Sequence, residues 1–198
     1  FVSPTVSVHF VNDAAGHISK TQATLRVELL VTALSGQDYS PAPITVDDAT
    51  NTEVRFELFL PPDSTYRFEV RFRNDSDNSL VGEGAVIEQI SEEAASVEIP
   101  VVSLRGDPWF GVIPASISVP ASSQSLDLDM RYYGDASAIA GIAARLTVSG
   151  SNPISLENID FQGADLVETE SGSVSLAWQF GSSGSATNPL ELGTIRIP

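Results

Sequence analysis

The chain has 198 residues, no cysteine and a formal net charge of −16 at pH 7. Its 26 acidic residues stand against nine arginines and one lysine, so it lacks the clustered cations with which nucleic-acid binders neutralise phosphate. The absence of cysteine excludes disulfide scaffolds, zinc fingers and thiol enzymes, while 42% apolar residues suffice to bury a core.

The sequence shows no apolar run near the roughly 20 residues that a membrane-spanning helix needs. The chain begins at Phe1 rather than Met, and no signal peptide is visible. We expect an exported chain whose signal peptide has been removed, located outside the cell or on its surface. An acidic surface with little lysine keeps such a protein soluble at high salt and repels anionic lipid.

The first half of the chain alternates apolar and polar residues with the period of two that is typical of half-buried strands. A short helical turn over Ser91–Ala95 is the one exception that we expect. The predicted strands cover Thr5–Val11, Thr24–Leu34, Glu53–Leu60, Tyr66–Arg73, Leu80–Ile90 and Ser96–Leu104.

Residues 105–115 indicate a linker, because glycine and proline punctuate the segment around Trp109 and Phe110. Two aromatic residues in a linker favour docking against a neighbouring domain. Strand patterns then resume over Ser125–Tyr133, Ile139–Val148, Ile154–Phe161, Leu166–Glu170, Ser173–Phe180 and Leu190–Ile197. The sequence therefore predicts an all-β fold of two tandem β-sandwich domains, residues 1–104 and 116–198.

The segment Leu60-Pro-Pro-Asp-Ser-Thr-Tyr66 resembles the corner of fibronectin type III and related immunoglobulin-like (Ig-like) domains. The resemblance implies that Tyr66 is a tyrosine corner, whose hydroxyl bonds to the backbone a few residues upstream. A simple hairpin between the strands on either side is the alternative. It would set opposite charges across from each other, pairing Glu57 with Arg67, Arg55 with Glu69 and Glu53 with Arg71. We favour the corner.

The second half, residues 117–197, resembles a shortened cohesin-like domain, a sandwich that related carbohydrate-binding modules also use. The matching segments are Leu126-Asp-Leu-Asp-Met130, Ile139-Ala-Gly141-Ile142, Asn152-Pro153-Ile154-Ser-Leu156 and Leu192-Gly193-Thr194-Ile195-Arg196-Ile197. Asn152 stands where cohesins carry the Asp of an Asp-Pro step. The resemblance implies a cell-surface or scaffold module.

Oxygen-rich turns are the candidate metal sites. Asp75 and Asp77 lie in an Asn/Asp/Ser-rich loop, and Asp47 is followed directly by Asp48. Calcium takes six to eight oxygen ligands from such loops, so calcium is a possible cofactor. The alternative is a solvated turn in which these side chains cap their own backbone, and we favour it. We expect no other cofactor.

Three further patterns point to other chemistry. Asp127 and Asp129 share one strand face. Paired carboxylates can act as acid and base on a glycoside, but they must then face each other across a cleft, so we expect these two on a solvent-exposed face. His9 and His17 are the only histidines, and no Gly-x-Ser-x-Gly turn accompanies them, so we do not expect histidine-based catalysis. The tripeptide at 105–107 spells Arg-Gly-Asp, an adhesion motif that also arises by chance.

Aromatic side chains are the candidate ligand-binding residues, because sugars stack on exposed rings. Tyr133 falls on the outward phase of its strand, and Trp109 and Phe110 lie in the predicted linker. Trp178 shares the phase of its apolar neighbours, so we expect it in the core.

These observations predict a non-enzymatic module for protein–protein interaction, adhesion or scaffolding. The alternatives are a carbohydrate-binding module appended to a secreted enzyme and a passive spacer. The expected partner is thus a protein or a polysaccharide, recognised on the surface or along an open strand edge.

Overall fold

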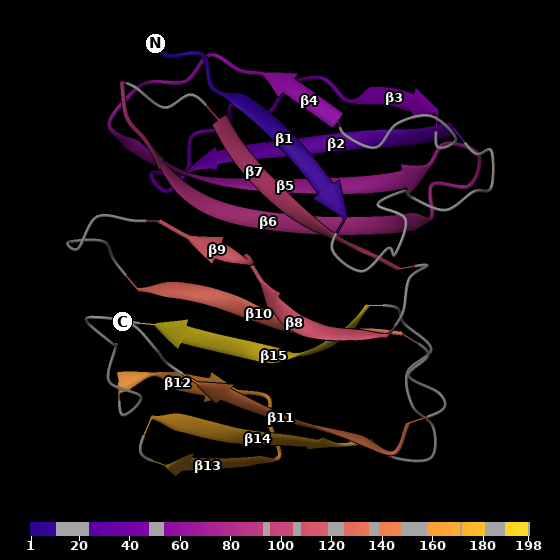
Figure 1. Ribbon diagram of the computed structural model, residues 1–198, viewed down its shortest axis with the longest axis vertical. Coiled ribbons are helices and arrows are strands. Elements are labelled where there is room, and N and C mark those ends of the chain that lie inside the picture. The colour runs from indigo at the N-terminus through magenta and orange to yellow at the C-terminus, as the bar shows by residue number, and fades with distance from the viewer. Residues whose placement is uncertain are drawn as a thin grey trace. The chain divides into compact units, whose positions relative to one another are not determined.

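The computed structural model describes residues 1–10, 24–47, 54–92, 96–104, 108–118, 125–134, 139–147, 158–170, 172–180 and 189–197. The regular structure of these residues consists of β-strands (Figure 1), so the all-β prediction is confirmed. The chain divides into two compact units. One comprises Phe1–Trp109 and Ile113–Ser122, and the other comprises Phe110–Val112 and Ser123–Pro198.

The first unit is one continuous path of hydrogen-bonded strands in the order β3-β2-β5-β6-β7-β1-β4, with β9 attached to β6 (Figure 1). Neighbours along this path are antiparallel, except that β1 pairs in parallel with β7 and β9 in parallel with β6. The strands are β1 (Thr5–Phe10), β2 (Thr24–Ala33), β3 (Ile44–Asp47), β4 (Val54–Glu57), β5 (Ser64–Asn74), β6 (Leu80–Ile90), β7 (Ser96–Ser103) and β9 (Ser116–Ile117).

The core of the first unit follows from the alternation of its strands. In β2 and β5 every second side chain is buried, including Leu25, Val27, Phe68 and Phe72. These residues form one apolar cluster with buried side chains from β1, β4 and β7. The strand path therefore folds around a single core, which burial of apolar area stabilises.

The second unit contains two sheets, ordered β12-β15-β10-β8 and β11-β14-β13. Trp178 of β14 contacts the other sheet twice. Its Nε1 donates to the carbonyl of Leu192 at 2.9 Å, and its ring lies 5.8 Å from that of Phe110. The strands are β8 (Trp109–Ile113), β10 (Leu126–Tyr133), β11 (Gly141–Thr147), β12 (Asp160–Gln162), β13 (Leu166–Glu170), β14 (Ser173–Gln179) and β15 (Leu190–Ile197).

Several predicted boundaries differ from the observed ones. The segment assigned to a linker contains β8, and residues 113–122 cluster with the first unit because β9 pairs with β6. Strand β3 lies where no strand was predicted. The strand predicted from residue 154 begins at Asp160 in the described residues, and residues 151–157 lie outside them. So do residues 93–95 of the expected helical turn.

Tyr66 makes the bond that the corner interpretation predicted. Its hydroxyl donates to the carbonyl oxygen of Pro61 at 2.8 Å, and its ring is fully buried. Burial raises the pKa of the Tyr66 phenol above its ordinary value, which keeps the hydroxyl protonated as a donor. The hairpin alternative is wrong, because β4 pairs with β1 whereas β5 pairs with β2 and β6.

Candidate binding groove

Strands β6 and β7 pair at one end and then separate. Their ladder joins Gly82 to Ser103 and Glu83 to Val102. The next contact is a close one, since a Cβ on Gly84 would lie 2.2 Å from the carbonyl oxygen of Pro100. Proline has no N–H to donate to a ladder, so Pro100 ends the pairing on this side of β7.

Strand β9 takes the place of β7 on the edge of β6. The amide of Ala115 donates to Ala85 at 2.8 Å, and that of Ser118 donates to Ile87 at 2.7 Å. Between Ser96 and Pro100, β7 is paired with β1 on its other side. The edge of β7 that faces β6 therefore has no ladder partner among the described strands over this stretch.

A groove of about 370 Å³ lies in this opening, within the range of about 300–1,000 Å³ that ligand sites occupy. Val86 of β6 and Val97 of β7 form its apolar floor, and both belong to the core cluster. Glu88, Ser96, Glu98, Pro100 and Ser116 line the rest. The two valines are almost fully buried, so the groove joins an open strand edge to the margin of the core.

Glu88 places a carboxylate on the core side of β6. It lies between Val86 and Ile90 in the two-residue repeat, and both of these neighbours are buried. Its register partner on β5 is the buried Tyr66. Among the described residues neither Glu88 nor Glu98 has an ion-pair partner. A half-buried carboxylate on an apolar face is costly unless a donor or cation reaches it.

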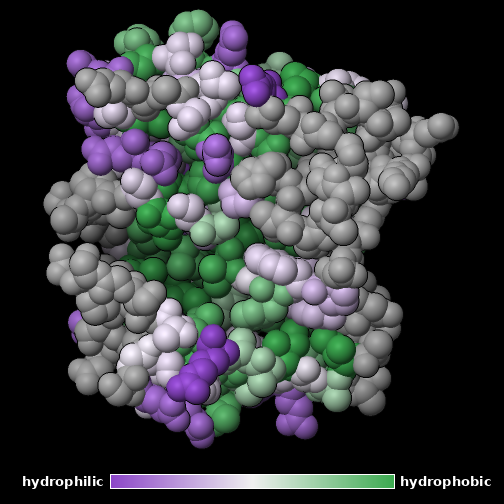
Figure 2. Space-filling model, in the orientation of Figure 1, coloured by the Kyte–Doolittle hydropathy of each residue, from purple (hydrophilic) through white to green (hydrophobic). Residues whose placement is uncertain are grey.

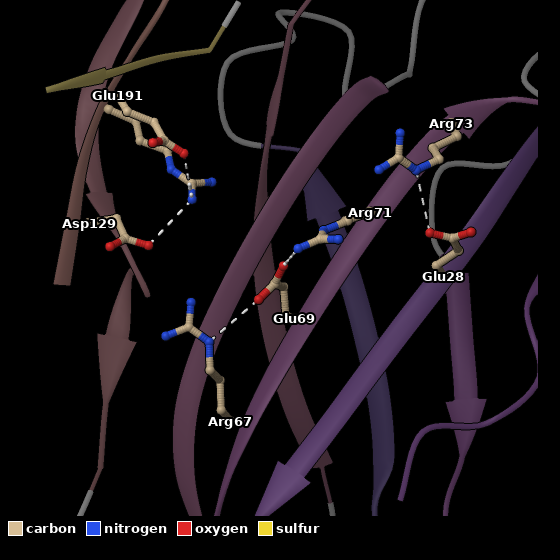
Figure 3. A network of polar contacts seen from close by, with 8 residues as sticks. Glu28, Arg67, Glu69, Arg71, Arg73, Asp129 and Glu191 are labelled. Atoms are coloured by element: carbon tan, nitrogen blue, oxygen red, sulfur yellow. Dashed lines mark hydrogen bonds and ion pairs between the residues drawn. The ribbon is translucent and has the colours of Figure 1, made fainter. Parts of the chain in front are cut away.

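The other face of this sheet shows the contrasting arrangement (Figure 3). Glu28 accepts from Arg26 at 2.5 Å and from Arg73 at 3.4 Å. Glu69 lies between Arg67, at 3.5 Å, and Arg71. Each of these two carboxylates is paired with two guanidinium groups. This ion-pair network stabilises the sheet and neutralises both glutamates.

The aromatic candidates lie elsewhere, and Tyr133 is not on the surface. Its exposed fraction is 1%, so the prediction of an outward ring is wrong. The alternation of β10 stops after Met130, at the point where its register with β15 shifts and Leu192 of β15 has no partner. Trp109 and Phe110 are half-buried in β8, and Phe110 packs on Trp178, which is in the core as expected.

Of the two calcium candidates, Asp77 caps its own loop. Asp77 accepts from the backbone amide and hydroxyl of Ser79 at 3.0 and 2.6 Å, and Asn74 does the same for Ser76. Asp75 is exposed in the same turn. No group of three or more histidine or acidic side chains among the described residues is placed to hold a metal ion. These side-chain-to-backbone bonds are the ones typical of Asx turns.

The paired aspartates take part in ion pairs. Asp127 accepts two bonds from Arg196, at 2.8 and 2.9 Å, and Asp129 contacts Arg131 at 3.3 Å. The hydrogen bond from Arg196 lowers the pKa of the Asp127 carboxyl. The side chains of His9 and Asp47 and residues 17, 48 and 105–107 lie outside the described part of the chain.

Apolar side chains also reach the surface. Hydrophobic residues are visible on the face shown in Figure 2. The large exposed ones among the described residues are Phe1, Leu30, Leu34, Phe59, Leu166 and Val167. Phe59, which follows β4, is 72% exposed, and β13 carries both Leu166 and Val167.

Sequence reasoning did not single out the groove or its two glutamates. Glu88 left a signal, since it interrupts an apolar face at the position between Val86 and Ile90. Pro100 and Gly84 are the only signs in the sequence that β6 and β7 separate, and the sequence does not show that these two residues meet.

Neither a scan against protein-family models nor a search of curated proteins finds a match. A solved structure from Bacteroides thetaiotaomicron VPI-5482, a proposed polysaccharide-binding protein (DUF1812), is 11% identical with a TM-score of 0.33. The match covers 98% of this chain and 64% of that one, so this chain spans less than two thirds of its length. No helix among the described residues is long and apolar enough to cross a membrane.

Proposed function

We propose that the chain is a non-enzymatic module, outside the cell or on its surface, that binds a protein partner by adding a strand at the β6–β7 groove. In this proposal the two units are an Ig-like and a cohesin-like sandwich. The observation that carries it is the separation of β6 and β7, which leaves the β7 edge open beside the apolar floor of Val86 and Val97.

The direction of the backbone groups supports strand addition. The Pro100 carbonyl points toward Gly84 of β6. The N–H and C=O of one strand residue point to the same side, and successive residues alternate, so Ser96 and Glu98 present theirs to the groove as well. A partner strand gains affinity from such main-chain bonds and specificity from pockets for alternate side chains.

The test selects eight-residue peptides from an unbiased library against the purified full chain. Glu98→Pro removes one groove-facing amide, and Glu98→Ala is the matched control that keeps it. We expect the selected peptides to bind Glu98→Pro at least tenfold more weakly than Glu98→Ala. Both variants lack the carboxylate, so the difference between them reports the amide alone. Thermal unfolding of both variants checks that the fold persists. Equal affinity for the two variants would contradict the proposal.

A carbohydrate-binding module is the second candidate, favoured by the exposed ring of Phe59. Affinity electrophoresis through gels that contain soluble polysaccharides separates the two functions. Retardation that Phe59→Ala abolishes, together with failure to select any peptide, would establish the carbohydrate function instead. A passive spacer would give neither result.

A further inference from the structure

We infer that the groove selects a cationic extended segment of the partner, in which lysine or arginine flanks an apolar residue. This inference rests on the proposed function, since it names the chemistry of the strand that is added. It is carried by the two groove carboxylates and by the spacing between them and the apolar floor.

Glu88 defines the position of one cation. Val86 and Glu88 are two residues apart on the same side of β6, and the side chains of an added strand share a face at the same spacing. An apolar side chain over Val86 therefore brings the side chain two residues along to Glu88. Lysine and arginine suit this place, because their stems cover apolar surface while the charged head reaches the carboxylate.

Glu98 defines a second cation on the opposite face. It is exposed, and it adjoins Val97 of the floor in the alternating pattern of β7. A residue of the added strand next to the apolar one points to this face. The recognised pattern is thus an apolar residue, then a cation for Glu98, then a cation for Glu88.

Charge balance elsewhere makes these glutamates distinctive. Glu28 and Glu69 each have arginines in contact, whereas no described residue neutralises Glu88 or Glu98. The chain as a whole carries −16, which favours approach of a cationic segment over an anionic one.

The experiment measures fluorescence anisotropy of labelled peptides with the full chain at low salt. The probe is Ser-Thr-Val-Arg-Lys-Thr-Thr-Ser, and its neutral counterpart has glutamine at both cationic positions. We expect the cationic peptide to bind at least tenfold more tightly. Glu88→Gln and Glu98→Gln should each weaken it about three- to tenfold. The matched control Glu28→Gln, on β2 and outside the lining of the groove, should leave its affinity unchanged.

The outcomes distinguish this inference from the function on which it rests. Equal binding of the two peptides, or library-selected peptides that bind at the edge without cations, would overturn the inference and leave strand addition intact. Failure of every peptide would overturn both. A concentration-dependent dimer that Glu98→Pro abolishes would overturn the inference in favour of a second copy of this chain as the occupant.

Discussion

The hydroxyl of Tyr66 joins the start of β5 to the chain that leads into it, through the carbonyl of Pro61. We expect Tyr66→Phe to lower the free energy of unfolding by about 0.5–1.5 kcal/mol, because the ring still packs while one hydrogen bond is lost. Urea denaturation measures the difference. Tyr39→Phe is the control, since it keeps the edge-on contact between the rings of Tyr39 and Tyr66. An unchanged free energy of unfolding in Tyr66→Phe would show that the hydrogen bond of the corner does not stabilise the fold.

The ion pair of Asp127 and Arg196 predicts a dependence on pH. The folded state lowers the pKa of the Asp127 carboxyl, chiefly through the hydrogen bond from Arg196. The pair therefore stabilises the chain above the ordinary aspartate pKa of 3.8, and this gain is lost as the pH falls through the lower folded value. Because both side chains are about half exposed, the gain is small.

Denaturation curves of the wild type and Asp127→Asn test this expectation. We expect the variant to be less stable at pH 7 and the two curves to converge as the pH falls below about 4, near the unperturbed carboxyl pKa. A difference that stays constant down to pH 2 would contradict the assigned cause.

Among the strands, the point where β6 and β7 part depends on Gly84. A Cβ there would meet the Pro100 backbone oxygen at 2.2 Å. We expect Gly84→Ala to destabilise the chain by about 1–3 kcal/mol, as overpacking does. Gly172→Asn is the control, because a Cβ at Gly172 has nothing within 4 Å and Asn tolerates its positive φ. Thermal unfolding that ranks the control as the more damaging change would contradict this account of the point where β6 and β7 separate.

Strand content was predictable, because period-two alternation is a local property. The clear runs in β2, β5 and β14 lie where the pattern placed them. Pairing was not predictable to the same degree. The charges of 53–57 and 67–71 fit a hairpin as well as they fit the observed strands, and only long-range contacts decide between them.

The candidate site was less predictable than the strands. The alternation of β10 stops after Met130, so extending it to Tyr133 gave the wrong facing. The glycine beside the register shift, Gly193, lies on β15, and the sequence does not show that it pairs with Met130. The groove depends on Gly84 and Pro100, which meet only after β6 and β7 pair. A site made by two strands that separate has no local sequence signal.

At the scale of the whole molecule, the net charge of −16 makes binding sensitive to salt. The Debye length is about 10 Å at 0.1 M salt and about 3 Å at 1 M. We expect the affinity of the cationic peptide to fall at least fivefold between 0.05 and 0.5 M NaCl, measured by anisotropy. Under the same conditions the neutral peptide should change less than twofold. Equal salt dependence of the two peptides would contradict a role for the groove carboxylates.

Amide hydrogen exchange by NMR on the full chain, with and without the cationic peptide, tests the central claim most directly. In the free chain we expect the amides of Ser96 and Glu98 to exchange quickly, because they face the open groove. Those of Val97 and Ile99, which face β1, should exchange slowly. Peptide binding should then protect Ser96 and Glu98. Protection of these two amides in the free chain, or peptide-induced protection confined to other strands, would contradict strand addition at the β6–β7 groove.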